Sequence, residues 1–207
     1  MSSVKPIPAS LEQPDTVARG LKHLWIHTQQ VRDLEKAGEY IVIKSGDGIW
    51  LEDIADNRYI DTMSGLWVVA IGHGRETLAR VAAQQMATLP YANPFAYATE
   101  PAIDLAERLA AITPDKLTRT YFVNTGAEAV ETAIRMAKQY QYNRGEQGRF
   151  KVISRTGSYH GMTHGALTVN GGTAINRAPF EPLLPGNIPV PNVNGIGSLS
   201  NDKTGLD

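Results

Sequence analysis

The 207-residue chain contains no cysteine, which excludes disulfides, cysteine-bound iron–sulfur clusters and catalysis by a thiol. Neither sign of charge is in excess, because 20 Lys and Arg stand against 21 Asp and Glu. A near-neutral chain gives no electrostatic reason to expect nucleic acid or an acidic membrane surface as a partner. No stretch is apolar over the length of a membrane span, and the first residues lack the apolar segment of a signal peptide. We therefore expect a cytoplasmic protein without a membrane or nucleic-acid partner.

The first half of the chain indicates an arm, a small sheet and two helices. Residues 1–18 are rich in Pro and Ser, and we expect an N-terminal arm that becomes ordered only on a partner surface. Short alternating apolar runs, separated by turn residues at 46–48 and 56–57, predict a small antiparallel meander. Apolar residues recur at helical spacing over 76–89 and 100–112, which predicts two helices.

In the second half of the chain, short strand-like apolar runs alternate with helical segments, which predicts an α/β fold. Residues 119–123, RTYFV, read as a short buried strand, followed by a helix over 126–142. Residues 151–155, KVISR, read as the next strand, and a short helix is expected over 163–169. Strand, helix and strand in this order predict a right-handed βαβ unit in a largely parallel sheet. Everything further along the chain reads as loop, because it is dense in Pro and Gly.

The segment NTGAEAVETAIRMA predicts a helix that begins with a capping box. Thr125 stands at the N-cap position and Glu128 three residues later, so that each side chain can bond the other residue's backbone N–H. Gly126 and Ala127 leave the first N–H groups sterically open, and the helix dipole favours an anion there by roughly 0.3–1 kcal/mol when exposed. Taken alone, this segment is better explained as an ordinary capped helix without a ligand, because both the T-x-x-E pattern and a Gly-Ala pair are common.

A second segment, TGSYHGMTHGAL, strengthens the case for a binding site. It follows the predicted strand 151–155, so in a parallel sheet it emerges at the same edge as Gly126. Tyr159 and His160 would then lie near a bound phosphate. Taken singly, a histidine such as His160 is more often a structural residue bonded to the backbone, and a tyrosine such as Tyr159 is more often part of the core. Together with an anion site, an aromatic face suits a flat phosphorylated cofactor.

Three segments of the chain together resemble the class III aminotransferases, which are fold-type I enzymes dependent on pyridoxal 5′-phosphate. These segments are YFVNTGAEAVETAIRMAK, SYHGMTHGALTVNGG and the upstream GDGIWLEDIADNRYIDTMSGLWVVAIGHGR, whose end is similar to the ω-amine:pyruvate branch. The resemblance runs from about residue 20 to about residue 190. It implies that residues 19–70 form the N-terminal segment of the small domain. Residues 71–207 would form part of the large cofactor-binding domain, with a mixed, mostly parallel sheet.

The resemblance also implies roles for particular residues. The cofactor-binding set comprises Thr125, Gly126, Ala127, Tyr159 and His160. Backbone N–H groups of Gly126 and Ala127 would bind the cofactor phosphate, Tyr159 would stack on the pyridine ring, and His160 would support its loop. No metal site is implied.

In the same family, the substrate pocket is completed by other segments. Leu66 and Trp67 would line it, and the active site would lie in a homodimer or a larger homo-oligomer. The Schiff-base lysine and the aspartate that pairs with the pyridinium nitrogen are expected beyond residue 207. The chain is therefore identified as the N-terminal part of such an enzyme and is expected to be inactive alone.

The expected reaction moves an amino group from an amine or ω-amino acid to a keto acid such as pyruvate. Two alternatives remain open. One is an aminomutase or racemase that uses pyridoxal phosphate on the same fold. The other is a non-catalytic fragment, or the partner subunit of a split enzyme.

Overall fold

The computed structural model describes residues 15–114, 116–171 and 177–192. The chain forms two compact units that divide between Ala98 and Thr99, and each unit is described by itself. The division into domains at residues 70 and 71 stays a prediction. Residues 1–14 of the predicted arm lie outside the described residues, whereas its last residues cap and begin a helix.

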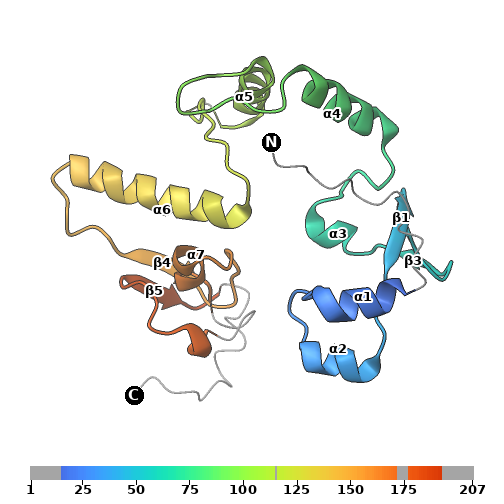
Figure 1. The fold of residues 1–207 in the computed structure, drawn as a ribbon. Coiled ribbons are helices and arrows are strands. Elements are labelled where there is room, and N and C mark those ends of the chain that lie inside the picture. Colours follow the sequence, from blue (N-terminus) through green and yellow to red (C-terminus); the bar gives the residue numbers. More distant parts are fainter. Residues whose placement is uncertain (1–14, 115, 172–176, 193–207) are drawn as a thin grey trace, which may run out of the picture. The chain divides into compact units, whose positions relative to one another are not determined.

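The first unit combines short helices with one small sheet (Figure 1). Its elements are α1 (Thr16–His23), α2 (Val31–Ala37), β1 (Ile43–Asp47), β2 (Trp50–Asp53), β3 (Arg58–Ile60), α3 (Ser64–Trp67) and α4 (Glu76–Thr88). The helical spacing over 76–89 predicts α4, whereas α1 and α2 were not predicted. A local signal for α1 exists, because Asp15 caps it by accepting a hydrogen bond from the backbone N–H of Ala18 at 2.7 Å.

The sheet of the first unit confirms the predicted meander. β2 lies between β1 and β3 and pairs with both in the antiparallel sense. At the turn between β2 and β3, Asp53 Oδ1 accepts hydrogen bonds from the backbone N–H groups of Ala55 at 2.8 Å and Asn57 at 2.9 Å. Its Oδ2 accepts from the Asn57 amide at 3.0 Å and from the Tyr59 hydroxyl at 2.7 Å. One buried carboxylate therefore organises the whole turn.

The second unit contains the longest helix and a parallel pair of strands (Figure 1). Its elements are α5 (Glu100–Ile112), α6 (Gly126–Asn143), β4 (Val152–Arg155), α7 (His164–Thr168), the 3₁₀ helix η1 (Ala178–Phe180) and β5 (Asn187–Val190). The predicted helices over 100–112, 126–142 and 163–169 are confirmed. Pro101 in the first turn of α5 fits the position where a helix needs no N–H donor.

Two predictions for the strands of this unit are wrong. Residues 119–123 form no strand in the part of the chain that the structure describes, because no described segment pairs with them. Instead β4 pairs in parallel with β5, a stretch whose Pro and Gly content predicts loop. Pro189 within β5 conceals the strand from sequence patterns, since proline is tolerated only at sheet edges. The parallel βαβ unit thus encloses α7, not α6.

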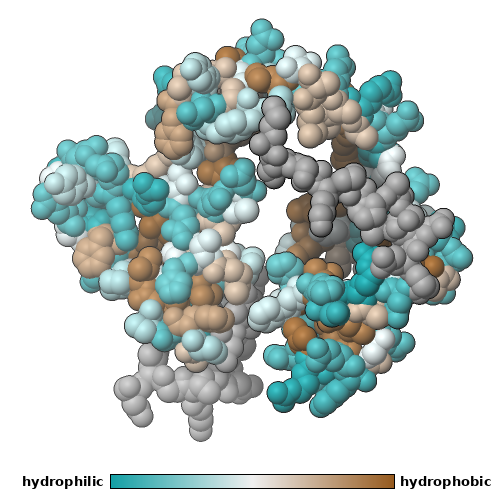
Figure 2. Space-filling view, viewed as in Figure 1, coloured by the Kyte–Doolittle hydropathy of each residue, from teal (hydrophilic) through white to brown (hydrophobic). Residues whose placement is uncertain are grey.

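The buried part of the second unit centres on α7. Among the residues that the structure describes, the buried hydrophobic ones are Ala166, Leu167 and Val169, and Asn170 beside them is 2% exposed. Large apolar side chains elsewhere in this unit are exposed, among them Tyr121 and Ile153. Figure 2 shows hydrophobic residues, in brown, on the surface of both units. No helix in the described ranges is long and apolar enough to cross a membrane.

Candidate functional site

The N-terminus of α6 presents free backbone donors. Thr125 Oγ1 accepts from the N–H of Glu128 at 3.1 Å, while Glu128 Oε2 accepts from the N–H groups of Asn124 at 2.7 Å and Thr125 at 3.3 Å. The predicted capping box is therefore confirmed. Among the residues that the structure describes, none accepts a hydrogen bond from Gly126 N–H or Ala127 N–H. A Cβ atom built on Gly126 meets nothing within 4 Å, so a ligand can reach these donors.

The loop after β4, residues 156–163, faces this helix end, and we call it the Tyr159 loop. Helix end and loop enclose an open hollow of about 680 Å³. Its lining residues are Thr125, Gly126, Ala127, Val130, Tyr159, His160, Gly161, Met162 and Thr163. The hollow therefore brings together all the residues of the predicted cofactor-binding set.

The hollow suits a phosphorylated aromatic group. Open amide donors and the positive end of the α6 dipole favour a phosphate at Gly126 and Ala127. Tyr159 is 54% exposed, so its ring remains accessible to a flat partner. The volume lies within the range of roughly 300–1,000 Å³ that is typical of cofactor and ligand sites. No lysine and no aspartate belongs to this lining in the described part of the chain. These residues can hold and orient a cofactor, but they supply no amine for a covalent bond to it.

Two residues that were not predicted to belong to the site fix the Tyr159 loop. Asn170 Oδ1 accepts from His160 N–H at 2.6 Å, and its Nδ2 donates to the carbonyl of Gly161 at 2.9 Å. Glu131 on α6 accepts from Thr163 Oγ1 at 2.7 Å. Both residues lie within segments that resemble class III aminotransferases, and this resemblance was the signal that could have indicated them.

The predicted substrate residues Leu66 and Trp67 belong to the first unit, in α3, and not to the residues around the hollow. They lie in a left-handed turn, with φ of +64° and +68°. Such a conformation costs roughly 1–2 kcal/mol for each residue that has a Cβ atom. Asp61 helps to hold the turn, because its Oδ2 accepts from Gly65 N–H at 2.7 Å and lies 2.8 Å from His73 Nε2. The bond to His73 is the main cause of a lowered pKa of Asp61. Both predicted substrate residues are largely exposed.

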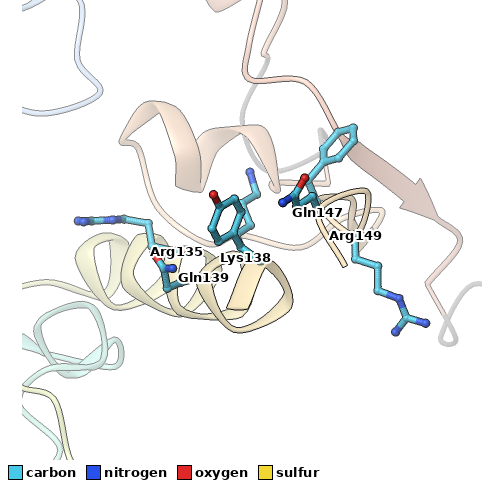
Figure 3. Close-up of a pocket in the computed structure, with 7 residues that line it drawn as sticks. Arg135, Lys138, Gln139, Gln147 and Arg149 are labelled. Carbon is cyan, nitrogen blue, oxygen red and sulfur yellow. The ribbon is translucent and has the colours of Figure 1, made fainter. Parts of the chain in front are cut away.

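A second hollow, of about 400 Å³, lies along the C-terminal part of α6 and the segment 147–150 (Figure 3). Arg135, Lys138 and Arg149 line it together with Gln139, Tyr142, Gln147 and Phe150. Figure 3 shows Arg135 and Arg149 extending in opposite directions. The charged groups do not converge on one point, so this hollow lacks the geometry of an anion site.

Comparisons with known proteins show the family of this chain. The family model described as aminotransferase class-III matches residues 33–203. The chain belongs to the class III aminotransferases. Proteins of this class are enzymes dependent on pyridoxal phosphate. The predicted fold class, fold type I, is thereby confirmed.

Individual relatives support the same assignment. A protein named as a probable aminotransferase in Mycobacterium tuberculosis is 46% identical over 92% of this chain and 40% of its own length. The omega-aminotransferase of Caulobacter vibrioides is 33% identical over 88% of this chain and 41% of its own length. A solved (S)-enantioselective omega-transaminase from Thermomicrobium roseum has a TM-score of 0.79 at 37% identity, covering 85% of this chain and 39% of that one. The chain thus spans about 40% of the length of the relatives it matches.

Proposed function

We propose that the chain forms the phosphate- and ring-binding side of a pyridoxal 5′-phosphate site in an aminotransferase. The enzyme would move an amino group from an amine or ω-amino acid to a keto acid such as pyruvate. The observation that carries this proposal is the hollow that combines the open N-terminus of α6 with Tyr159. Support for the substrate class comes from relatives named beta-alanine–pyruvate and putrescine–pyruvate aminotransferase, both from Pseudomonas aeruginosa.

In this proposal each residue of the hollow binds or orients. The N–H groups of Gly126 and Ala127 hold the phosphate, and Thr125 fixes the first turn of α6 through the capping box. Tyr159 packs on the ring, while the backbone of His160 keeps the loop in place. When bound, the cofactor supplies the electron sink for chemistry at the amino-bearing carbon.

A non-catalytic role of this chain is the second candidate. The observation that favours it is the lining of the hollow, which contains no lysine within the described residues. The chain would then bind the cofactor while other parts of the protein, or a separate subunit, supply the reacting amine. An aminomutase or racemase on the same framework would use the same cofactor site.

Further elements of the proposal concern the surroundings of the site. Leu66 and Trp67 would line the substrate pocket, which their exposed side chains permit. A homodimer or larger homo-oligomer would cover exposed apolar residues such as Phe95, which is 96% exposed. The cytoplasmic location stays a prediction that rests on composition.

The substitution Gly126→Asp tests the anion site. A carboxylate at this position would face the phosphate, and two like charges about 4 Å apart at an effective dielectric constant of about 20 repel by about 4 kcal/mol. We therefore expect affinity for pyridoxal 5′-phosphate, measured by calorimetry, to fall by about 100-fold or more. Gly148→Asp is the matched control, because a Cβ atom at Gly148 also meets nothing within 4 Å and this residue lies outside the hollow. Unchanged affinity in Gly126→Asp would refute the assignment.

A further inference from the structure

Asn170 binds the backbone of the Tyr159 loop through both ends of its side-chain amide. Its Oδ1 accepts from His160 N–H at 2.6 Å, and its Nδ2 donates to the Gly161 carbonyl at 2.9 Å. The residue is 2% exposed, and Asn170 is the largest fully buried side chain of the described residues. Buried hydrogen bonds of this kind are costly to lose, because the abandoned partner stays away from water.

Further bonds hold Asn170 itself. The Arg177 guanidinium donates from Nη1 to the Asn170 carbonyl at 2.9 Å. The next residue, Gly171, donates its N–H to the Ser158 carbonyl at 2.9 Å and accepts from Gly157 N–H at 3.2 Å. The first part of the loop is therefore fastened to residues 170–171 over several consecutive positions.

Glu131 fastens the other end of the loop to α6. Its Oε1 accepts from Thr163 Oγ1 at 2.7 Å and from Gly165 N–H at 2.9 Å. The bond from Thr163 is the main cause of a lowered pKa of Glu131, so the carboxylate remains ionised near neutral pH. Since Glu131 lies on the same helix as Gly126, it links the end of the loop to the helix that presents the anion donors.

We propose that Asn170 and Glu131 are positioning residues that set the distance between Tyr159 and the anion donors of α6. The inference rests on the proposed function, because it assigns the two residues to recognition of the pyridoxal ring. Asn170 binds the Tyr159 loop at His160, directly after Tyr159, and Glu131 on α6 binds the end of the loop at Thr163. Neither residue lines the hollow, so each acts through the loop.

Conservative substitutions separate this role from folding. Asn170→Asp keeps the acceptor for His160 N–H but turns an oxygen toward the Gly161 carbonyl, where a donor is needed. Asn143→Asp is the matched control, because Asn143 is exposed on α6 and its substitution adds the same negative charge. Glu131→Ala removes the acceptor for Thr163 and Gly165, whereas Glu131→Gln retains it.

The test compares two probes on the 207-residue chain, pyridoxal 5′-phosphate and inorganic phosphate. For Asn170→Asp and Glu131→Ala we expect the affinity for pyridoxal 5′-phosphate to fall about tenfold or more, as for a lost hydrogen bond of about 1.4 kcal/mol. Affinity for phosphate should change by less than about threefold, because the donors of Gly126 and Ala127 are on α6. Glu131→Gln should restore the ratio of the two affinities. If the two residues had a purely structural role, the substitutions would lower the affinity for both probes by a similar factor.

Hydrogen exchange of the loop amides provides a second measurement that does not need the cofactor. His160 N–H should be protected in the unaltered chain and should exchange faster in Asn170→Ala, with Asn143→Ala as control. The positioning role would be overturned if the His160 amide exchanged faster in Asn170→Ala while the ratio of the affinities for pyridoxal 5′-phosphate and phosphate stayed unchanged in Asn170→Asp. An unprotected His160 amide in the unaltered chain would overturn the bond itself. If the unaltered chain protects His160 but binds neither probe, the proposed function fails, and the assignment to ring recognition fails with it.

Discussion

Gly161 lies so close to Ala127 that a Cβ atom built on the glycine would stand 2.6 Å from the Cβ of Ala127 and 2.9 Å from its Cα. The backbone of Gly161 has φ of +127°, a conformation that L side chains rarely adopt. Both the lack of space and the backbone conformation therefore require glycine at position 161, where the Tyr159 loop touches the first turn of α6. This contact brings the loop and the helix end together around one hollow.

Gly161→Ala should push the loop away from α6. The added methyl group has no space beside Ala127, and overpacking of this kind costs about 1–3 kcal/mol. We expect a lower midpoint of thermal unfolding and weaker binding of pyridoxal 5′-phosphate. Gly148→Ala is the control, because its Cβ atom would meet nothing within 4 Å. Equal effects of the two substitutions would contradict the close approach.

The turn at Asp53 should make the first unit sensitive to acid. The pKa of Asp53 is lowered from 3.8 to about 2, chiefly by the side-chain bond from Asn57 and also by the Tyr59 hydroxyl. A lowered pKa in the folded state means that the stabilisation is complete above pH 4 and is lost as the pH falls toward 2. Asp53→Asn should reduce the loss of stability between pH 4 and pH 2, measured by urea unfolding. An unchanged pH dependence would show that other carboxylates cause the loss.

The left-handed turn at Leu66 should make glycine unusually well tolerated there. Leu66 has φ of +64° and is 62% exposed, so Leu66→Gly relieves backbone strain and loses little burial. We expect an unchanged or slightly higher midpoint of thermal unfolding. Leu78→Gly is the matched control, because Leu78 is 54% exposed but lies within α4, where glycine costs about 1 kcal/mol. A similar loss in both variants would argue against strain at Leu66.

The 207-residue chain alone should bind the cofactor without catalysing amino transfer. Amino transfer through pyridoxal phosphate uses a lysine amine that bonds to the cofactor, and no lysine lines the hollow in the described residues. Incubation of the chain with an amine donor and pyruvate should therefore yield no alanine above background, measured by mass spectrometry. The beta-alanine–pyruvate aminotransferase of Pseudomonas aeruginosa, run in the same assay with beta-alanine as the donor, is the positive control. Alanine formed by a chain of verified mass would show that another group replaces the expected lysine.

Local sequence determined the parts of the site that depend on neighbouring residues. Thr125 and Glu128 are three residues apart, so their reciprocal bonds form wherever this segment is helical, and the capping box could be predicted. The meander could be predicted for the same reason, because turn residues and alternating apolar residues act over a few positions. Motifs that resemble a known family also assign Tyr159 and Gly126 to one site from the sequence alone.

Only the tertiary structure decided which distant segments meet. Whether residues 119–123 or β5 pair with β4 depends on hydrogen bonds between segments far apart in sequence, which no local pattern encodes. The role of Asn170 was hidden for the same reason, since an asparagine in a Gly-rich stretch reads as a loop residue until its burial and its bonds to His160 and Gly161 are seen. The close approach of Gly161 to Ala127 likewise exists only once β4 and α6 are packed in one unit. The sequence favours a particular backbone conformation in each of the two segments, but it does not specify the distance between the segments.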